Sequence, residues 1–404
     1  MPGGSFRRPP SVCAKRTATE RTTDLIGAII TLALFAALNV AVVWGLLHLH
    51  PKRRTWIWIV VAFCNVFWAF LPMIFATRTS PLSRFVRAFF APPWFSWLLF
   101  ILLYAAFLLV LAAGWALFFR RLSFRDAGHV PSTIFLALLA ILGVLGYYDA
   151  TVPLRVERPV FRFEALDPAL HGTKVAVVSD LHVGMFSRPW RLRKIFERVN
   201  AERPDVLLLT GDMIDDDPHF VPKLLDGLRF LDPSIPAIAV LGNHEIYGDP
   251  RAVIRQLDGS RIRLLVNRGW AYERRGRGIW FAGISDYAAG SRRRGDEDLR
   301  PDFDAALAGK PAAYFPVVVA HQPKAFPESI ERGLPLTLCG HTHGGQLGSP
   351  PLGWSLAGMF LPYSMGAYHE RGSHAYVNAG TGYWVVPFRL GMTPEITIVR
   401  LEHH

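Results

Sequence analysis

The stretch that decides the fold is Lys174–His182, KVAVVSDLH, in which an apolar run gives way at once to an aspartate and a histidine. A short run of valine and alanine is typical of a strand that is buried on both faces of a sheet. Asp180 and His182 would follow this strand directly, at its carboxyl end. In open α/β sheets, this is the edge at which ligands bind.

The same pattern occurs four more times along the chain. Apolar runs precede the polar segments Gly211–Asp215 (GDMID), Gly242–Glu245 (GNHE), His321 and Gly340–Gly345 (GHTHGG). Each segment alone has a plain structural explanation, because Gly-Asp after a strand usually caps a loop or a helix. Their occurrence together, in this order, indicates a single site at a shared sheet edge.

Short apolar runs alternate with amphipathic segments throughout this part of the chain, which predicts sheet layers flanked by helices. The expected helices include Pro189–Ala201 and Val221–Phe230. The expected strands are Lys174–Ser179, Val206–Thr210, Ala237–Leu241, Ile279–Ile284, Pro316–Ala320, Leu336–Cys339, Ala375–Asn378 and Glu395–Leu401.

The polar residues at these strand ends are of the types that bind divalent metal ions. Carboxylate oxygen, amide oxygen and imidazole nitrogen form a mixed ligand set that suits Mn, Fe or Zn. The cysteines, Cys13, Cys64 and Cys339, have no CxxC spacing, which argues against a Cys-rich zinc site and a disulfide framework. Two metal ions that share a carboxylate would activate water and hold phosphoryl oxygens. We therefore expect two divalent metal ions per chain and phosphate-ester chemistry.

The first 150 residues are much more apolar than the rest of a chain that is 51% hydrophobic overall. A helix of about 20 apolar residues crosses a hydrocarbon core of about 30 Å. Tryptophan and tyrosine gather near the ends of four such stretches, as interfacial anchors do. The stretches are Leu25–Leu47, Trp56–Ala76, Trp94–Phe119 and Val130–Tyr148. Four in succession favour a transmembrane domain over buried helices of a soluble protein.

The expected organisation has four parts. A basic tail covers residues 1–24 and a four-helix transmembrane domain covers 25–150. A linker covers 151–173, and the α/β domain covers 174–402. The final His403-His404 pair is assigned no role.

The chain carries a formal net charge of +12. Its arginines are scattered, and no basic run is longer than three residues, as at Arg292–Arg294. This distribution is typical of basic loops beside a membrane, and it favours the lipid bilayer over nucleic acid as the partner. No obligate protein partner is evident from the sequence.

Taken in order, the strand-end motifs resemble those of the calcineurin-like metallophosphoesterases. The motifs are Asp180-x-His182, Gly211-Asp212-x-x-Asp215, Gly242-Asn243-His244-Glu245, His321 and Gly340-His341-x-His343. The continuation Gly344-Gly345-Gln346, with Pro387-Phe388-Arg389 and Pro394-Glu395-Ile396, is similar to a branch of membrane-linked bacterial phosphodiesterases. The resemblance covers about Leu166 to Leu401 and implies a β-sandwich of two sheets flanked by helices.

The resemblance also implies roles for individual residues. One metal ion would be held by Asp180, His182, Asp212 and His343. The other would be held by Asp212, Asn243, His321 and His341, with Asp212 bridging the two ions. His244 would act on the leaving oxygen, with Asp215 orienting it. Arg389 would contact a phosphate or form a structural ion pair, and Asp286 would face the site or cap a turn.

The expected activity is hydrolysis of a phosphodiester or a pyrophosphate bond. The preference for these bonds over a monoester follows from the branch resemblance alone. The substrate is either lipid-linked or a soluble phosphate ester such as a nucleotide. The apolar stretch Trp354–Tyr368 would serve as a substrate lip or as a covering loop. A non-catalytic metal-dependent membrane sensor is the alternative. Metal transport is disfavoured because the four apolar stretches contain no Asp, Glu, Lys or Arg.

The charges of the loops between the four stretches predict the orientation in the membrane. Ten basic residues lie on the side of the N-terminus and six on the opposite side, which favours a cytoplasmic location for both ends. A reporter that is active only in the periplasm, fused after Leu401, should therefore be silent. The same reporter fused after Arg53 should be active. A signal after Leu401 would place the α/β domain outside.

Overall fold

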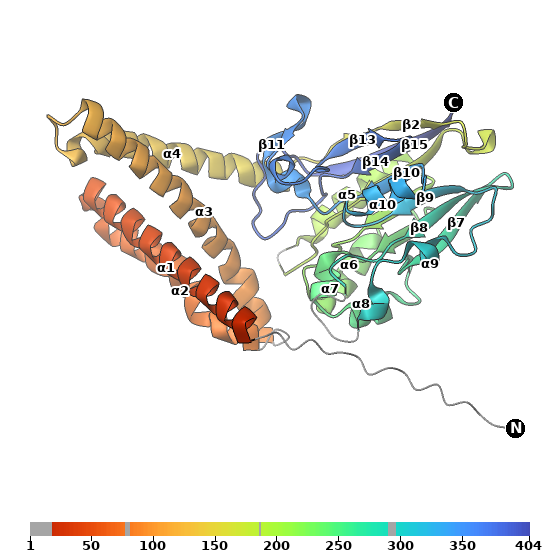
Figure 1. Ribbon diagram of the computed structural model, residues 1–404, viewed down its shortest axis with the longest axis horizontal. Helices are drawn as coiled ribbons and strands as arrows, with labels where there is room; N and C mark the ends of the chain where they lie inside the picture. Colours follow the sequence, from red (N-terminus) through yellow and green to blue (C-terminus); the bar gives the residue numbers. More distant parts are fainter. Residues whose placement is uncertain (1–17, 77–80, 186, 290–295) are drawn as a thin grey trace, which may run out of the picture. The chain divides into compact units, whose positions relative to one another are not determined.

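The computed structural model describes residues 18–76, 81–185, 187–289 and 296–404 (Figure 1). Most of the expected basic tail and the Arg292–Arg294 run lie outside the described residues. The chain forms two compact units. One consists of Met1–Ala69 with Pro93–Phe135, and the other consists of Phe70–Pro92 with Leu136–His404.

Long apolar helices make up the N-terminal part that the structure describes. They are α1 (Ala18–Leu49), α2 (Arg54–Ala76), α3 (Pro81–Phe118) and α4 (Phe124–Thr151). Three segments in the described residues are long and apolar enough to cross a membrane, namely Leu32–Leu49, Pro92–Phe118 and Phe124–Thr151. Large apolar side chains stand exposed on these helices, as lipid contact requires. Three of the four expected stretches therefore coincide with helices that are long and apolar enough to cross a membrane.

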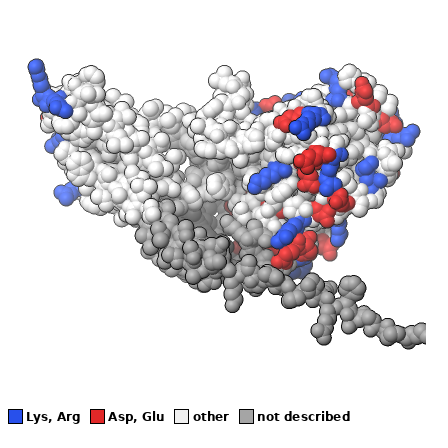
Figure 2. All heavy atoms as spheres, viewed as in Figure 1, with Lys and Arg blue, Asp and Glu red and all other residues white. Residues whose placement is uncertain are grey.

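The second expected stretch coincides with α2, whose side chains are described only in part. Its role as a fourth span therefore remains a prediction. Figure 2 shows that acidic and basic side chains gather on the α/β unit, whereas the visible face of the apolar helices carries few.

The α/β unit contains two mixed sheets in the described residues. The first has the order β1-β15-β3-β4-β5-β6, with β2 also paired to β15. Its strands are β1 (Arg155–Glu157), β2 (Val160–Phe163), β3 (Thr173–Val178), β4 (Val206–Thr210), β5 (Ala237–Val240), β6 (Ile262–Leu264) and β15 (Glu395–His403). Strands β3 to β6 are parallel, and β15 is antiparallel to β3.

The second sheet has the order β13-β14-β10-β9-β8-β7. Its strands are β7 (Arg268–Arg274), β8 (Arg277–Gly283), β9 (Phe315–Val319), β10 (Leu336–Cys339), β13 (Gly366–Glu370) and β14 (Ser373–Val377). Strands β8, β9, β10 and β14 are parallel. A separate small ribbon joins β11 (Gly348–Ser349) to β12 (Trp354–Ser355).

Successive apolar side chains of the central strands point to opposite faces of the sheet, which produces a layered core. In β3, Val175 and Val177 point into the space between the sheets and pack in one cluster with Phe281. The intervening Ala176 and Val178 face outward and join a second cluster with side chains of α5 and α6. The outer face of the other sheet packs in the same way against α9 and α10. The described unit is therefore a β-sandwich with helices on both outer faces, as expected.

The helices of this unit are short. They are α5 (Pro189–Glu202), α6 (Val221–Leu228), α7 (Asn243–Tyr247), α8 (Pro250–Leu257), α9 (Phe303–Leu307) and α10 (Ala325–Glu331). The segment expected to be a linker, residues 151–173, instead contains β1 and β2, both of which pair with β15. Neither strand consists of the continuous apolar run by which the buried strands were recognised in the sequence.

Candidate metal centre

Five parallel strands from the two sheets deliver polar side chains to one joint edge. Strand β3 leads to Asp180 and His182, and β4 leads to Asp212. Asn243 begins α7 after β5. In the second sheet, β9 leads to His321, and β10 leads to His341 and His343. Together with His244, they form three overlapping groups in which the polar atoms lie within 4.8 Å of one another: Asp180, His182 and His343; His182, Asp212 and His244; and Asp212, His321 and His341. The first and third groups form two clusters of expected ligands.

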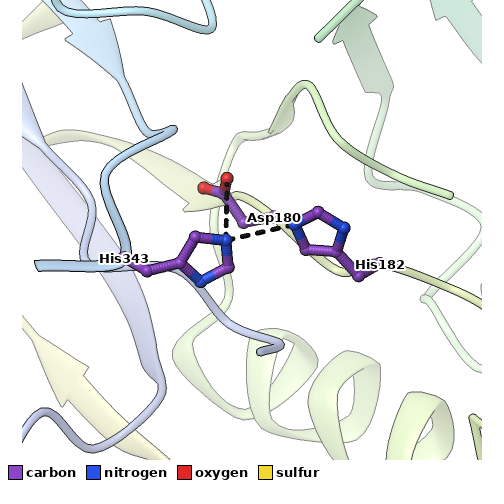
Figure 3. Close-up of side chains that lie close together, drawn as sticks. All are labelled: Asp180, His182 and His343. Atoms are coloured by element: carbon purple, nitrogen blue, oxygen red, sulfur yellow. Dashed lines mark hydrogen bonds and ion pairs between the residues drawn. The ribbon is translucent and has the colours of Figure 1, made fainter. Parts of the chain in front are cut away.

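The first cluster contains Asp180, His182 and His343, which point toward one another in Figure 3. Nε2 of His343 lies 3.4 Å from Oδ1 of Asp180 and 3.1 Å from Nε2 of His182. No hydrogen bond reaches this buried Asp180 oxygen from any residue that the structure describes. The second carboxylate oxygen of Asp180 accepts a hydrogen bond from the backbone N–H of His341, which fixes the direction of the first.

The second cluster surrounds His321. Its Nε2 lies 3.2 Å from Oδ2 of Asp212, 3.1 Å from Oδ1 of Asn243 and 3.2 Å from Nδ1 of His341. Asp212 also lies 3.8 Å from Nε2 of His182, so its carboxylate stands between the two clusters. This position is the one expected of a bridging ligand.

The hydrogen bonds behind the ring nitrogens show which atoms are free to bind a cation. Nδ1 of His321 donates to the carbonyl of Thr210, which can only accept, so in the neutral ring Nε2 presents its lone pair to the cluster. Nδ1 of His182 faces the Asp215 carboxylate at 3.0 Å, with the same consequence for its Nε2. Oxygen and nitrogen lone pairs at such separations repel one another unless a cation lies between them. The residues present therefore fit divalent metal ions. His343 differs from the other two rings: Arg389 can only donate to its Nδ1, so a metal ion at its Nε2 would have to displace a proton.

The electrostatics of His341 and Asp212 agree with this assignment, whereas those of His321 do not. Burial lowers the pKa of His321, but Asp212 outweighs that effect and raises it well above its ordinary value; bound cations would oppose this protonation. Burial, together with the charge of His321, lowers the pKa of His341 to about 3. The ring is therefore neutral at pH 7 and offers a lone pair. Burial raises the pKa of Asp212, but His321 and His244 outweigh that effect and hold it well below its ordinary value. Asp212 is therefore a carboxylate.

The backbone of the site is unusual. Five of the seven expected ligands, namely Asp180, His182, Asp212, His341 and His343, have positive φ between 45° and 76°. Such conformations cost on the order of 1–3 kcal/mol each in non-glycine residues and persist only where the surrounding structure enforces them. Gly242 allows the Asp212 carboxylate to lie close to its backbone, because a Cβ at residue 242 would meet Oδ1 of Asp212 at 2.2 Å.

Glu245 supports the site without facing it. It is fully buried and accepts hydrogen bonds from the backbone N–H groups of Asp212, Ile214 and Gly242. These bonds fix the loop that carries the bridging carboxylate. Glu245 belongs to the motif Gly242-Asn243-His244-Glu245, but no role was predicted for it from the sequence. Its position at the start of α7, three residues after Gly242, was the available signal, because a glutamate there can cap the helix.

The contact with His244 that was expected of Asp215 is made by Asp216 instead. Nδ1 of His244 lies 2.9 Å from Oδ1 of Asp216, whereas Asp215 contacts His182. Three aspartates follow one another at residues 215–217, and the left-handed backbone of Asp216 decides which of them reaches His244.

Two weaker expectations are resolved by burial. Arg389 is fully buried and contacts Nδ1 of His343 at 2.9 Å, which differs from the phosphate contact considered from the sequence. Asp286 is also fully buried; its Oδ1 accepts hydrogen bonds from the backbone of Ala288 and the side chain of Gln322. This placement is that of a turn cap.

Comparison with known proteins gives matches to the same part of the chain. The pattern of the calcineurin-like phosphoesterase family matches residues 173–345. An uncharacterized metallophosphoesterase of Helicobacter pylori (strain J99) is 31% identical over 267 residues, which cover 65% of this chain and 68% of that protein.

A transmembrane protein with metallophosphoesterase domain from Danio rerio is 30% identical over 274 residues. The match covers 66% of this chain and 62% of the relative, so it spans less than two thirds of that protein's length. Among solved structures, a 5'-nucleotidase precursor from Thermus thermophilus aligns with a TM-score of 0.36 at 17% identity, over 51% of this chain and 48% of that one.

The position of Asp212 between the clusters predicts its importance for metal binding. Asp212→Ala should reduce the metal content from two ions to at most one per chain, because the ions would lose their shared carboxylate. Elemental analysis of the purified full chain measures this content. Asp286→Asn, which changes a buried carboxylate outside both clusters, should keep both ions. Two ions in Asp212→Ala would contradict the assignment.

Proposed function

The chain belongs to the calcineurin-like metallophosphoesterases, which are metal-dependent phosphoric ester hydrolases, and on that premise we propose that it uses two divalent metal ions to cleave a phosphodiester or pyrophosphate bond. The observation that carries the proposal is the Asp212 carboxylate, which stands between two clusters of metal-binding side chains.

The proposed ligands of the first ion are Asp180, His182, Asp212 and His343, and those of the second are Asp212, Asn243, His321 and His341. The oxygen and nitrogen donors suit Mn, Fe or Zn. Two bound ions would supply charge to hold the phosphoryl oxygens and to lower the pKa of water. The protein itself aims the ligands, through the strand ends and the backbone hydrogen bonds behind them.

His244 is the proposed proton donor to the leaving oxygen. Its Nε2 points toward the metal clusters, 4.0 Å from Asp212, while its Nδ1 contacts Asp216. Burial lowers the pKa of His244, but Asp212 and Asp216 outweigh that effect and raise it to about 10. Bound cations would offset the contribution of Asp212, whereas the contact with Asp216 would persist. A metal-binding sensor needs no such proton donor, so hydrolysis is favoured over sensing.

The N-terminal helices support a membrane location for this activity. We propose that α2 is a fourth span beside the three that qualify by length and hydropathy. The basic loops favour a cytoplasmic location for both ends and hence for the α/β domain. The proposed parts are a basic tail, the transmembrane domain and the phosphoesterase domain.

The role of His244 can be tested with substrates that differ in their leaving group. His244→Ala should keep its metal ions yet lose about 10²–10⁴-fold in kcat on alkyl esters, the usual contribution of acid–base assistance. The loss should shrink for p-nitrophenyl esters, whose leaving group needs no proton. Asp216→Asn should reproduce part of this pattern, and Asp215→Asn should not. An equal loss on both ester classes would refute the assignment.

A lipid-linked substrate is favoured over a soluble one by an apolar lobe, residues 350–361. Leu352, Met359 and Phe360 are 82%, 64% and 77% exposed. The lobe directly follows the loop of His343. The segments before and after the lobe are hydrogen-bonded to neighbouring loops. Gly348 donates a backbone hydrogen bond to Leu390, and the Thr342 hydroxyl donates to the carbonyl of Ser364. An exposed apolar surface beside a polar site suits a substrate with an acyl chain and a phosphate.

The lobe predicts a difference between two classes of substrate. The double variant Phe360→Ser with Leu361→Ser should lower kcat/KM on a phospholipid in mixed micelles by about tenfold, which corresponds to about 1.4 kcal/mol of lost apolar contact. It should leave bis-p-nitrophenyl phosphate hydrolysis unchanged. Phe230→Ser, at an exposed phenylalanine beyond α6, is the control. Equal effects on both substrates, or faster hydrolysis of cyclic nucleotides than of lipids, would exclude the lipid-linked substrate.

A further inference from the structure

The last turns of α4 are bound to the segment Val386–Pro394. The end of this helix belongs to the same compact unit as the α/β domain. The carbonyl of Gly146 accepts a hydrogen bond of 3.0 Å from the backbone N–H of Arg389. The Asp149 carboxylate accepts two more, from the backbone of Gly391 at 3.0 Å and from the hydroxyl of Thr393 at 2.6 Å.

Packing reinforces these hydrogen bonds at Gly146. A Cβ at this position would lie 2.3 Å from the ring of Phe388, far closer than any real contact. The absence of a side chain therefore allows the Phe388 ring to lie directly on the helix backbone. Arg389 is thus held in two ways. Its backbone N–H donates to the helix, and the residue before it, Phe388, packs against the helix.

The side chain of Arg389 points the other way, to the back of the proposed metal site. Its guanidinium donates to the carbonyls of Ala379, Gly380 and Met392 at distances of 2.7–3.2 Å. Its Nη2 also donates to Nδ1 of His343 at 2.9 Å, so Nε2 of a neutral ring carries the proton, which a metal ion would displace while Arg389 stabilises the ring that has lost it. The opposite ring nitrogen of His343 faces Asp180 and His182. Arg389 is therefore the one described residue that contacts both the backbone of α4 and a proposed metal ligand.

We propose that Gly146 and Asp149, in the last turns of the membrane helix α4, position Arg389 and through it His343, so that the seating of this helix sets the affinity for the metal ion held by Asp180, His182 and His343. The proposal rests on the proposed function, because it takes His343 to be a ligand. It assigns Gly146, Asp149 and Arg389 as positioning residues. The second ion, at His321 and His341, has no such connection to the helix in the described residues.

Two glycines of α4 provide a matched test. Gly146→Ala should displace Phe388 and Arg389, although alanine itself favours the helix over glycine. Gly143→Ala adds the same methyl group less than one turn earlier, where no atom lies within 4 Å of a new Cβ. Outer contacts of metal ligands are worth about 10–100-fold in metal affinity. Gly146→Ala should therefore lose one ion at about a tenfold lower chelator concentration, and Gly143→Ala should match the wild type.

The measurement uses the full chain in detergent, loaded with Mn²⁺ and dialysed against graded chelator, with metal content determined by mass spectrometry. Asp149→Ala, which removes both acceptors of these hydrogen bonds, should lose the same ion. Asp126→Ala, at the other end of α4, is its control.

The outcomes separate the inference from the proposed function. If the wild type binds two ions and Gly146→Ala and Asp149→Ala retain both as tightly, the inference is wrong and the proposed function stands. Loss of both ions together, with a lower melting temperature, would mean that the variant destabilises the whole domain. This result would also overturn the inference. A wild type that binds no second ion would contradict the proposed function itself.

Discussion

The convergence of lone pairs at the joint edge of the two sheets is the constraint on which the rest of the structure depends. Around Nε2 of His321, three acceptor atoms lie within 3.2 Å. Such groups are costly to bury together unless cations compensate them. The parallel strands β3, β4, β5, β9 and β10 make the convergence possible, because their carboxyl ends meet at one edge.

The same constraint explains the strained backbone. A ligand that directly follows a buried strand must turn back toward the site within one or two residues. Left-handed conformations at residues such as Asp180 and Asp212 provide that turn. The cost is offset by the apolar core between the sheets and by hydrogen bonds such as those of Glu245 to the loop of Asp212. Rigid strands below and a fixed loop above hold the ligands in place before any ion arrives.

Much of this architecture could be predicted from the sequence, for a definable reason. The central strands are buried on both faces, so they form continuous apolar runs, and the predicted bounds of β4 and β10 agree with the structure. The polar residues that follow these strands could then be placed at one edge of the sheet. Short strands such as β1 and β6 were not predicted, because three residues carry no readable period. The membrane helices were predicted from length and hydropathy alone.

The orientation of individual side chains could not be predicted in the same way. Asp215 and Asp216 are adjacent and chemically identical, and only the backbone turn decides that Asp216 reaches His244. Arg389 looks like a phosphate ligand in the sequence, yet its complete burial turns it toward carbonyls and His343. Both cases depend on local conformation, which residue type and spacing do not encode.

The central claim is that two metal ions share Asp212, and X-ray absorption spectroscopy of the manganese-loaded full chain tests it most directly. The account predicts nitrogen and oxygen neighbours around each ion and a second manganese at about 3.5–4 Å. A spectrum without manganese–manganese scattering, from protein that carries its full complement of metal, would contradict it.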